Sequence, residues 1–112
     1  MLKLIVPAVT GWLRETGKIV ALIKPQFEAG PDQVGKGGVV RDASIHRAVL
    51  EDLVAWASER GIGLAGLIRS PILGPAGNVE FLAHWVPGCA TTLDASSLIQ
   101  ACVKPLGGDG HD

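Results

Sequence analysis

Lys24 and Glu80 are the two residues of this 112-residue sequence whose positions most strongly suggest chemistry. Lys24 stands at the carboxyl end of the apolar run Ile19–Ile23, and Glu80 lies within the apolar segment 79–86. Burying an unpaired charge is costly, so an ionised group beside buried strands needs a partner or a function. A lysine and a carboxylate held together could orient each other and handle a proton in general acid–base catalysis.

The segment around Lys24 predicts how its side chain is positioned. Residues 19–23 are continuously apolar, which is typical of a strand buried on both faces of a parallel sheet. Pro25 favours extended geometry at Lys24 and supplies no amide donor, so we expect the strand to end there and the ammonium to project into the crevice beyond. In open α/β sheets this crevice is the usual ligand site.

Residues 79–86 predict a strand in the interior of the sheet, because both of its faces are largely apolar. If this strand lies beside the first, Lys24 is the natural counter-charge for Glu80. The pair then has two interpretations, a structural ion pair or a catalytic pair. Buried ion pairs seldom add stability compared with apolar residues of similar volume, and the crevice position favours the catalytic interpretation.

A glycine-rich segment over residues 26–41 is expected to form a loop. Lys36, Gly37, Gly38 and Arg41 combine backbone amides at flexible glycines with two cations, which could cradle a phosphate. The segment lacks the GxxxxGK[ST] and GxGxxG patterns, and its composition is equally typical of a mobile loop. Whether it contacts a ligand therefore stays open, although its length favours a functional loop.

The clearest predicted helix begins after residue 42. Asp42 is a good N-cap candidate, apolar residues recur on one face as far as about Arg60, and Gly61 ends the helix. His46, in the first turn, is assigned to the solvated face. The remaining expected elements are a helix over residues 2–13, strands over 18–24, 63–68 and 79–86, and a short helix over 93–103. The last two strands are joined without a helix, so they can be antiparallel.

Composition excludes several classes of function. The formal net charge of −1 argues against nucleic-acid binding driven by whole-domain electrostatics, so any RNA contact must be local. Cys89 and Cys102 have neither a CxxC spacing nor nearby ligand partners and are expected to be reduced and structural. The histidines lack metal-ligand spacing, so no metal site is expected. No apolar run approaches the roughly 18 residues that span a bilayer.

Three strings of residues resemble the TlyA (hemolysin A) proteins, which are FtsJ-like RNA 2′-O-ribose methyltransferases. They are LIKPQFEAG at residues 22–30, VGKGGVVRD at residues 34–42 and GNVEF at residues 77–81. His46 is a further point of likeness. The resemblance extends from about Leu2 to Val86, and the residues after Pro87 carry none.

The resemblance implies an α/β fold, the carboxyl-terminal half of a Rossmann-like, S-adenosylmethionine-dependent methyltransferase. In that fold the last strand is antiparallel and lies between the fifth and sixth strands. The expectation here is a three-stranded mixed sheet, with its last strand antiparallel and central, and with flanking helices. Residues 1–88 would be the carboxyl-terminal part of the methyltransferase domain, and residues 89–112 a tail with a short helix followed by a disordered end.

The resemblance also implies roles for individual residues. The family's catalytic set is a Lys-Asp-Lys-Glu tetrad, in which Lys24 matches the second lysine and Glu80 matches the glutamate. Lys24 would assist loss of the ribose hydroxyl proton as a nearby cation or, once deprotonated, as the base, and Glu80 would orient it. The residues expected near RNA or cofactor are Gln26, Lys36, Gly37, Gly38 and Arg41.

The implied cofactor is S-adenosyl-L-methionine, and the implied partner is ribosomal RNA in the cytoplasm. The other two tetrad residues, a glycine-rich cofactor turn, an acidic ribose ligand and an S4-like RNA-binding segment have no counterpart in this sequence. We therefore expect the chain alone to bind the cofactor weakly or not at all, as a truncated protein or as one half of a two-polypeptide site. Its own catalytic activity stays open.

Without the strands that precede it in the family, the strand at residues 19–23 would also be an open edge that invites pairing with another copy.

The leading functional prediction is thus the carboxyl-terminal portion of an rRNA 2′-O-ribose methyltransferase. The alternative is a non-enzymatic RNA-binding or interaction module that retains the fold. Membrane lysis, suggested only by the older family name, has the least support because the sequence offers neither a spanning segment nor a strongly basic amphipathic helix.

Overall fold

A computed structural model describes residues 2–3, 17–35, 37–91 and 94–103. Most of the helix predicted over residues 2–13 and the end after residue 103 lie outside the described residues. The described elements are β1 (Ile19–Ile23), α2 (Pro25–Glu28), the 3-10 helix η1 (Pro31–Gln33), α3 (Ala43–Glu59), β2 (Ile62–Arg69), the 3-10 helix η2 (Pro75–Gly77), β3 (Phe81–Pro87) and α4 (Ala95–Val103).

The three strands form one sheet in the order β1-β3-β2. β3 is antiparallel to both neighbours, so the two outer strands run in the same direction and the central strand opposes them. The register pairs Ile23 with Phe81 on one side of β3 and Arg69 with Phe81 on the other. The prediction of a central, antiparallel last strand is therefore confirmed.

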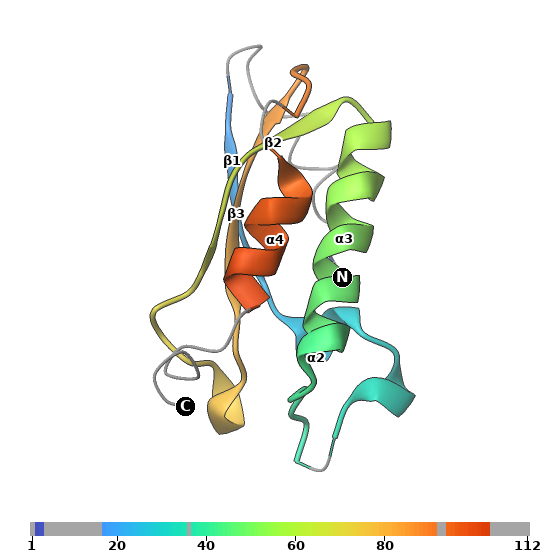
Figure 1. Cartoon of the computed structure of the whole chain (residues 1–112), viewed down its shortest axis with the longest axis vertical. Coiled ribbons are helices and arrows are strands. Elements are labelled where there is room, and N and C mark those ends of the chain that lie inside the picture. The colour runs from blue at the N-terminus through green and yellow to red at the C-terminus, as the bar shows by residue number, and fades with distance from the viewer. Residues whose placement is uncertain (1, 4–16, 36, 92–93, 104–112) are drawn as a thin grey trace.

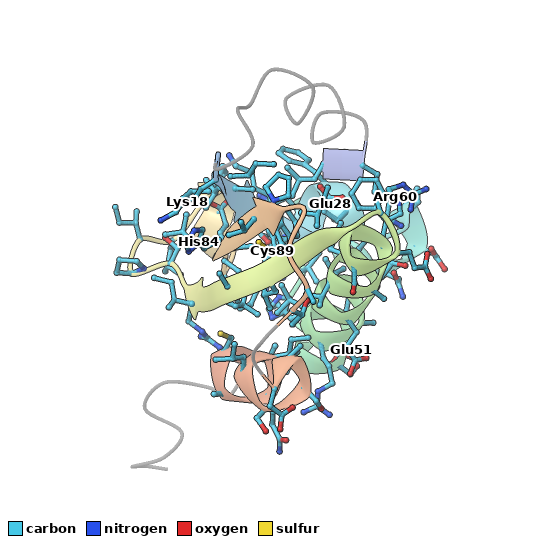
Figure 2. All side chains as sticks on the ribbon, turned by 90° about the horizontal axis from the view of Figure 1, so that it is seen from above. Lys18, Glu28, Glu51, Arg60, His84 and Cys89 are labelled. Carbon is cyan, nitrogen blue, oxygen red and sulfur yellow. The ribbon has the colours of Figure 1, made fainter. Side chains whose placement is uncertain are left out.

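One face of the sheet carries the hydrophobic core. Both α3 and α4 pack on this face, on the same side of the sheet in both views (Figures 1 and 2). The largest fully buried side chains of the core come from all three strands and from α3, and they include Trp85, Phe81, Ile23, Leu50, Leu53 and Leu64. Since apolar burial is the dominant favourable term in folding, this layer fixes the strand ends that carry the candidate site.

The opposite face of the sheet is more open than the sequence suggested. Along β1, buried and exposed residues alternate, and Val20 is 71% exposed. The prediction that β1 is buried on both faces of a parallel sheet was therefore wrong for the part of the chain that the structure describes. The reason is its pairing with an antiparallel strand in a sheet of which α3 and α4 cover the same face.

Helix α3 begins and ends as predicted. Asp42 is the N-cap, and its carboxylate accepts hydrogen bonds from the Ser44 amide at 2.8 Å and the Ser44 hydroxyl at 2.7 Å. These bonds favour the charged form and lower the pKa of Asp42 from its ordinary value of 3.8. Gly61, just after the helix, has a φ of +75°, a left-handed conformation that glycine adopts without strain.

Two element boundaries differ from the sequence prediction. β3 begins at Phe81, so Glu80 precedes the strand and does not lie within it. The segment 26–41 is not wholly loop, because Pro25 occupies the first turn of α2 and Pro31 begins η1. Proline at the first helical position has a preset φ and loses no hydrogen bond there, which explains both short helices.

The short helix predicted over residues 93–103 is present as α4. Its residues Ile99, Cys102 and Val103 are buried against the core. The guanidinium of Arg69 donates a hydrogen bond from Nε to the Cys102 carbonyl at 2.9 Å, which joins α4 to the end of β2. The division of the chain at residue 88 stays a prediction. Among the described residues, no helix is both long and apolar enough to cross a membrane.

Candidate active site

Lys24 and Glu80 flank the same end of the sheet. Lys24 directly follows β1 and is the N-cap of α2, while Glu80 directly precedes β3. The β1–β3 register ends at the pair of Ile23 and Phe81, and its continuation by one residue places Lys24 across from Glu80. Two residues 56 positions apart in the sequence thus become cross-strand neighbours by register, as the sequence predicted.

The charges of these neighbours make separate contacts. The Glu80 side chain is buried, with 5% of the residue exposed, and its Oε2 accepts a hydrogen bond from Gln26 Nε2 at 3.1 Å. The half-buried Lys24 places its Nζ 5.8 Å from the centre of the Phe27 ring, a cation–π arrangement. Among the described residues, no ion pair joins Lys24 and Glu80.

Gly74 completes the surroundings of the Glu80 carboxylate. A Cβ atom added to this glycine would overlap Glu80 Oε2, so the backbone lies directly against the carboxylate. The backbone of Glu80 is also held, because its carbonyl accepts a hydrogen bond from the Ser70 amide at 2.8 Å. A side chain at position 74 would therefore have to displace the Glu80 carboxylate. The backbone itself sets no such limit, because its φ of −82° is open to any residue.

Asn78 links the glycine-rich segment to the approach to Glu80. Its side chain is buried, accepts a hydrogen bond from the Val40 amide at 3.0 Å, and donates to the carbonyls of Gly38 at 2.9 Å and Pro75 at 3.0 Å. A single side-chain amide therefore ties the glycine-rich segment at Gly38 and Val40 to the turn at Pro75. Both segments lie at the lower end of the view in Figure 1. Because its donors and its acceptor are all used, Asn78 is well suited to fix this end of the molecule.

The glycine-rich segment itself is turned back by Gly37 and Gly38, which both have φ near +80°. The Gly35 amide donates to the Val39 carbonyl at 2.7 Å, closing the turn. Arg41 is exposed just beyond it, while Lys36 lies outside the described residues. Asn78 thus brings Gly38 beside the turn that leads to Glu80, whereas the described residues show no contact from Arg41 to Lys24 or Glu80.

His46 differs from its sequence prediction. Its side chain is 4% exposed, where a solvated position was expected. Its Nε2 lies 2.9 Å from the Val40 carbonyl, and its ring meets Phe81 edge-on at 5.7 Å. Spacing could have revealed this, because His46 falls three and four residues before the buried Val49 and Leu50, on the inner face of α3. His46 therefore contacts the Val40 carbonyl, while Asn78 accepts the hydrogen bond of the Val40 amide.

Sequence reasoning also missed Gln26 as the partner of Glu80, and it missed Asn78 and Gly74. Gln26 was assigned only to a ligand-proximal loop. Asn78 follows Gly77 in a turn signal, which explains its backbone but not the long-range bonds of its side chain. No periodic pattern marks Gly74, because its requirement arises from a tertiary contact with a residue six positions away.

Two pockets formed by described residues lie away from this site. One of about 300 Å³ opens between α3 and α4, and one of about 180 Å³ lies between the α2–η1 segment and α3. Neither is lined by Lys24 or Glu80. Among the described residues, no group of three or more His, Cys, Asp and Glu side chains could hold a metal ion. These two pockets therefore give a cofactor no place beside Lys24.

Comparison with known proteins gives the family. The model of the FtsJ-like methyltransferase family matches residues 5–86, which include both Lys24 and Glu80. The chain belongs to the FtsJ-like methyltransferase family. The resemblance found in the sequence is therefore confirmed, and the predicted α/β methyltransferase fold with it.

Two curated proteins are similar to about seven-tenths of this chain. The Bacillus subtilis protein named "Putative rRNA methyltransferase YqxC" is 45% identical over 74% of this chain and 30% of its own length. The Mycobacterium tuberculosis 16S/23S rRNA (cytidine-2′-O)-methyltransferase TlyA is 42% identical over 69% of this chain and 29% of its own length. The chain thus spans about three-tenths of the length of the curated relatives that it matches.

Solved structures show the same FtsJ-like fold. A structure titled "Putative hemolysin from Streptococcus thermophilus" aligns with a TM-score of 0.74 and 46% identity, covering 81% of this chain and 33% of that one. A hemolysin-titled structure from Lactococcus lactis aligns with a TM-score of 0.70 and 43% identity, covering 80% of this chain and 44% of that one.

Proposed function

We propose that this chain is the carboxyl-terminal portion of an S-adenosylmethionine-dependent rRNA 2′-O-ribose methyltransferase. The observation that carries the proposal is the placement of Lys24 across from Glu80 by register, at one end of the sheet, within the FtsJ-like match. These residues match two members of the Lys-Asp-Lys-Glu tetrad of the TlyA proteins, which the sequence resembles. The names of the relatives support rRNA as the substrate and the ribose 2′ hydroxyl as the acceptor.

In the proposed reaction the methyl donor supplies an electrophilic methyl group, and this chain acts on the ribose hydroxyl that receives it. The Lys24 ammonium would lie beside that oxygen and stabilise the negative charge that develops as its proton leaves. Once deprotonated, the Lys24 amine could instead accept the proton. Glu80 would supply a fixed negative charge that orients the lysine. The anchored backbone of Glu80 and its buried side chain suit this role, because a positioning charge has to stay still.

The methyl donor needs residues beyond those described around Lys24. We propose that these belong to the rest of a complete methyltransferase, either on the same polypeptide or on a second one, and that this chain alone binds S-adenosylmethionine weakly or not at all. Calorimetry with S-adenosylmethionine and the isolated chain tests this point. Micromolar binding would contradict it.

RNA would meet this chain locally. The net charge of −1 offers little general attraction for a polyanion, so the contact would depend on the cations and amides near the site. The exposed Arg41, with Lys36 and the turn of Gly37 and Gly38, is the proposed contact with a phosphate of the RNA. If the segment lies near S-adenosylmethionine instead, it would contact polar groups other than phosphate, because that cofactor has none. The proposed compartment is the cytoplasm, where ribosomal RNA would be available.

The test is methyl transfer to rRNA by an assembly that contains this chain and the remainder of the methyltransferase. Lys24→Ala should lower the rate of transfer by at least about a hundredfold, as expected for loss of a group that handles a proton. The matched control is Lys18→Ala, which removes an exposed cation just before β1 and should leave the rate near that of the wild type. Full activity of the Lys24 variant would overturn the assignment.

The outer edge of β1 supports a further part of the proposal. Within the described residues β1 pairs only with β3, so its other edge is available to another strand. In the isolated chain this edge would pair with a second copy. Size-exclusion chromatography with light scattering should then show a dimer or larger oligomer, and a clean monomer would count against it.

A non-enzymatic RNA-binding or interaction module is the second candidate function. The observation that favours it is the contact between Glu80 and Gln26, which leaves the carboxylate bound within the protein without Lys24. An assembly that binds rRNA but transfers no methyl group would support this candidate over the enzyme.

A further inference from the structure

Gln26 makes the polar side-chain contact that the structure gives to the Glu80 carboxylate. It lies two residues after Lys24, in the first turn of α2, where the amides of Phe27 and Glu28 both point to the Lys24 carbonyl. This turn aims the Gln26 side chain at Glu80, with Nε2 and Oε2 3.1 Å apart. Gln26 therefore joins the segment of Lys24 to the segment of Glu80.

The chemistry of this contact fixes the orientation of the amide. An ionised carboxylate only accepts hydrogen bonds, so the group that faces it must be the amino end of the glutamine side chain. The carbonyl oxygen then faces the other way. This Oε1 atom is buried, and within the described residues it has no hydrogen-bond partner. A buried carbonyl oxygen without a donor is costly, so the site is arranged to receive one.

Lys24 carries a donor of the required kind on the same turn, two residues before Gln26. Its ammonium has three N–H donors and no acceptor, on a flexible four-carbon stem. It lies over the ring of Phe27, a residue 54% exposed, and a cation beside an exposed ring is held weakly. A charge-assisted hydrogen bond to a buried carbonyl is the stronger contact. A turn of the ammonium from Phe27 to Gln26 Oε1 would therefore be favourable.

We propose that Gln26 is a positioning residue that holds Glu80 through its amino group and receives the Lys24 ammonium on its carbonyl oxygen. The order of groups is Lys24 Nζ, Gln26 Oε1, Gln26 Nε2 and Glu80 Oε2. This link sets the direction of the lysine towards the substrate hydroxyl, and it explains how Glu80 acts on Lys24 without a direct ion pair. The catalytic meaning of the link rests on the proposed methyltransferase function.

Kinetics in the complete methyltransferase assembly test the role of Gln26. Gln26→Met keeps the length of the side chain and removes both hydrogen-bonding groups. It should lower kcat by up to about a hundredfold and leave KM for RNA within about twofold, as expected for lost alignment. In a Glu80→Gln background the same change should cost little more, because the two residues act as a unit. The control is Gln33→Met, at an exposed position.

A readout without activity uses the isolated chain. In ¹H–¹⁵N spectra, the side-chain amide of Gln26 should be protected from solvent exchange relative to that of Gln33, and Glu80→Gln should shift its signals. The Lys24 side-chain signals should shift in Gln26→Met, with Gln26→Asn as a second variant if the first does not fold. Unshifted Lys24 and Gln26 signals would overturn the proposed link.

The two failures are distinguishable. Wild-type methylation together with full kcat in Gln26→Met overturns the inference and leaves the proposed function standing. Absence of methylation in the wild-type assembly overturns the proposed function and the catalytic role of Gln26 together, while the spectra still decide whether the link exists.

Discussion

Lys24 and Glu80 are the next cross-strand neighbours beyond the pair of Ile23 and Phe81, yet no ion pair joins them among the described residues. Register places their backbones side by side, but the side chains make separate contacts, Glu80 with Gln26 and Lys24 with Phe27. This arrangement satisfies the buried carboxylate with a neutral donor and leaves the lysine movable. A direct buried ion pair would instead fix both groups and require the desolvation of two charges.

Gly74→Ala should destabilise the chain by about 1–3 kcal/mol, because the added methyl group overlaps a carboxylate that is buried and cannot easily move aside. Urea denaturation measures the loss. The cost should nearly disappear in a Glu80→Ala background, where the obstructing side chain is absent.

The matched control for Gly74 is Gly66→Ala in β2. A Cβ there would meet the Cβ of His84 at 3.6 Å, an ordinary contact, so little destabilisation is expected. Equal losses in the two alanine variants would show that the Glu80 carboxylate is not the cause at position 74.

Asn78→Ala should lower the free energy of unfolding by about 2 kcal/mol, because it leaves the buried Val40 amide without its acceptor and the Gly38 carbonyl without its donor. The Pro75 carbonyl keeps the backbone amide of residue 78. Hydrogen exchange should speed up at the Val40 amide in particular. Gln33→Ala is the control, since that exposed side chain accepts only the Gly30 amide. Unchanged protection of Val40 in the Asn78 variant would contradict the assigned network.

The sequence predicted those parts of the fold that depend on local signals. Helix-end signals predicted the N-cap at Asp42 and the glycine after α3. Hydrophobic periodicity predicted the three strands. The cross-strand placement of Lys24 and Glu80 needed one further assumption, that the first and last strands are adjacent. The family resemblance supplied that assumption.

The sequence could not predict the contacts that tertiary packing creates. Gln26 reaches Glu80 across 54 positions, and Asn78 reaches Val40 across 38. Neither contact has a spacing that one sequence reveals, because each depends on how a loop closes over the end of the sheet. His46 was misplaced for a different reason, since its polar character outweighed a helical spacing that pointed inward.

Acid should weaken α3 through its N-cap. The hydrogen bonds from Ser44 lower the pKa of Asp42 in the folded chain, so this carboxylate stabilises the fold above its ordinary value of 3.8. That contribution is lost as the pH falls through the lower, folded value. Asp42→Asn keeps an acceptor at the cap but does not titrate, so its free energy of unfolding should fall less between pH 5 and pH 2. Identical pH profiles of the two proteins would contradict this.

The two cysteines should react at very different rates. Cys89 is exposed, whereas Cys102 is buried and its thiol lies 3.4 Å from the Leu67 carbonyl. A thiol reagent should therefore modify one group at once in the native chain and the second only as the structure opens. Cys89→Ser should remove the fast phase, and two fast thiols in the wild type would contradict the burial of α4.

Burial of Cys102 also predicts how stability responds to alkali. Desolvation raises the pKa of this thiol above its ordinary value of 9.0, although the nearby Arg69 charge opposes the shift. Above that ordinary value the unfolded chain releases the thiol proton while the folded chain keeps it, so the unfolded state binds fewer protons and stability falls as the pH rises. The contribution is present below pH 9 and is lost as the pH passes through the folded value.

Unfolding free energies measured between pH 8 and pH 10 should therefore fall more steeply for Cys89→Ser, which keeps the buried thiol, than for Cys102→Ala, which removes it. Parallel slopes would show that the Cys102 thiol ionises as easily in the folded chain as in the unfolded one.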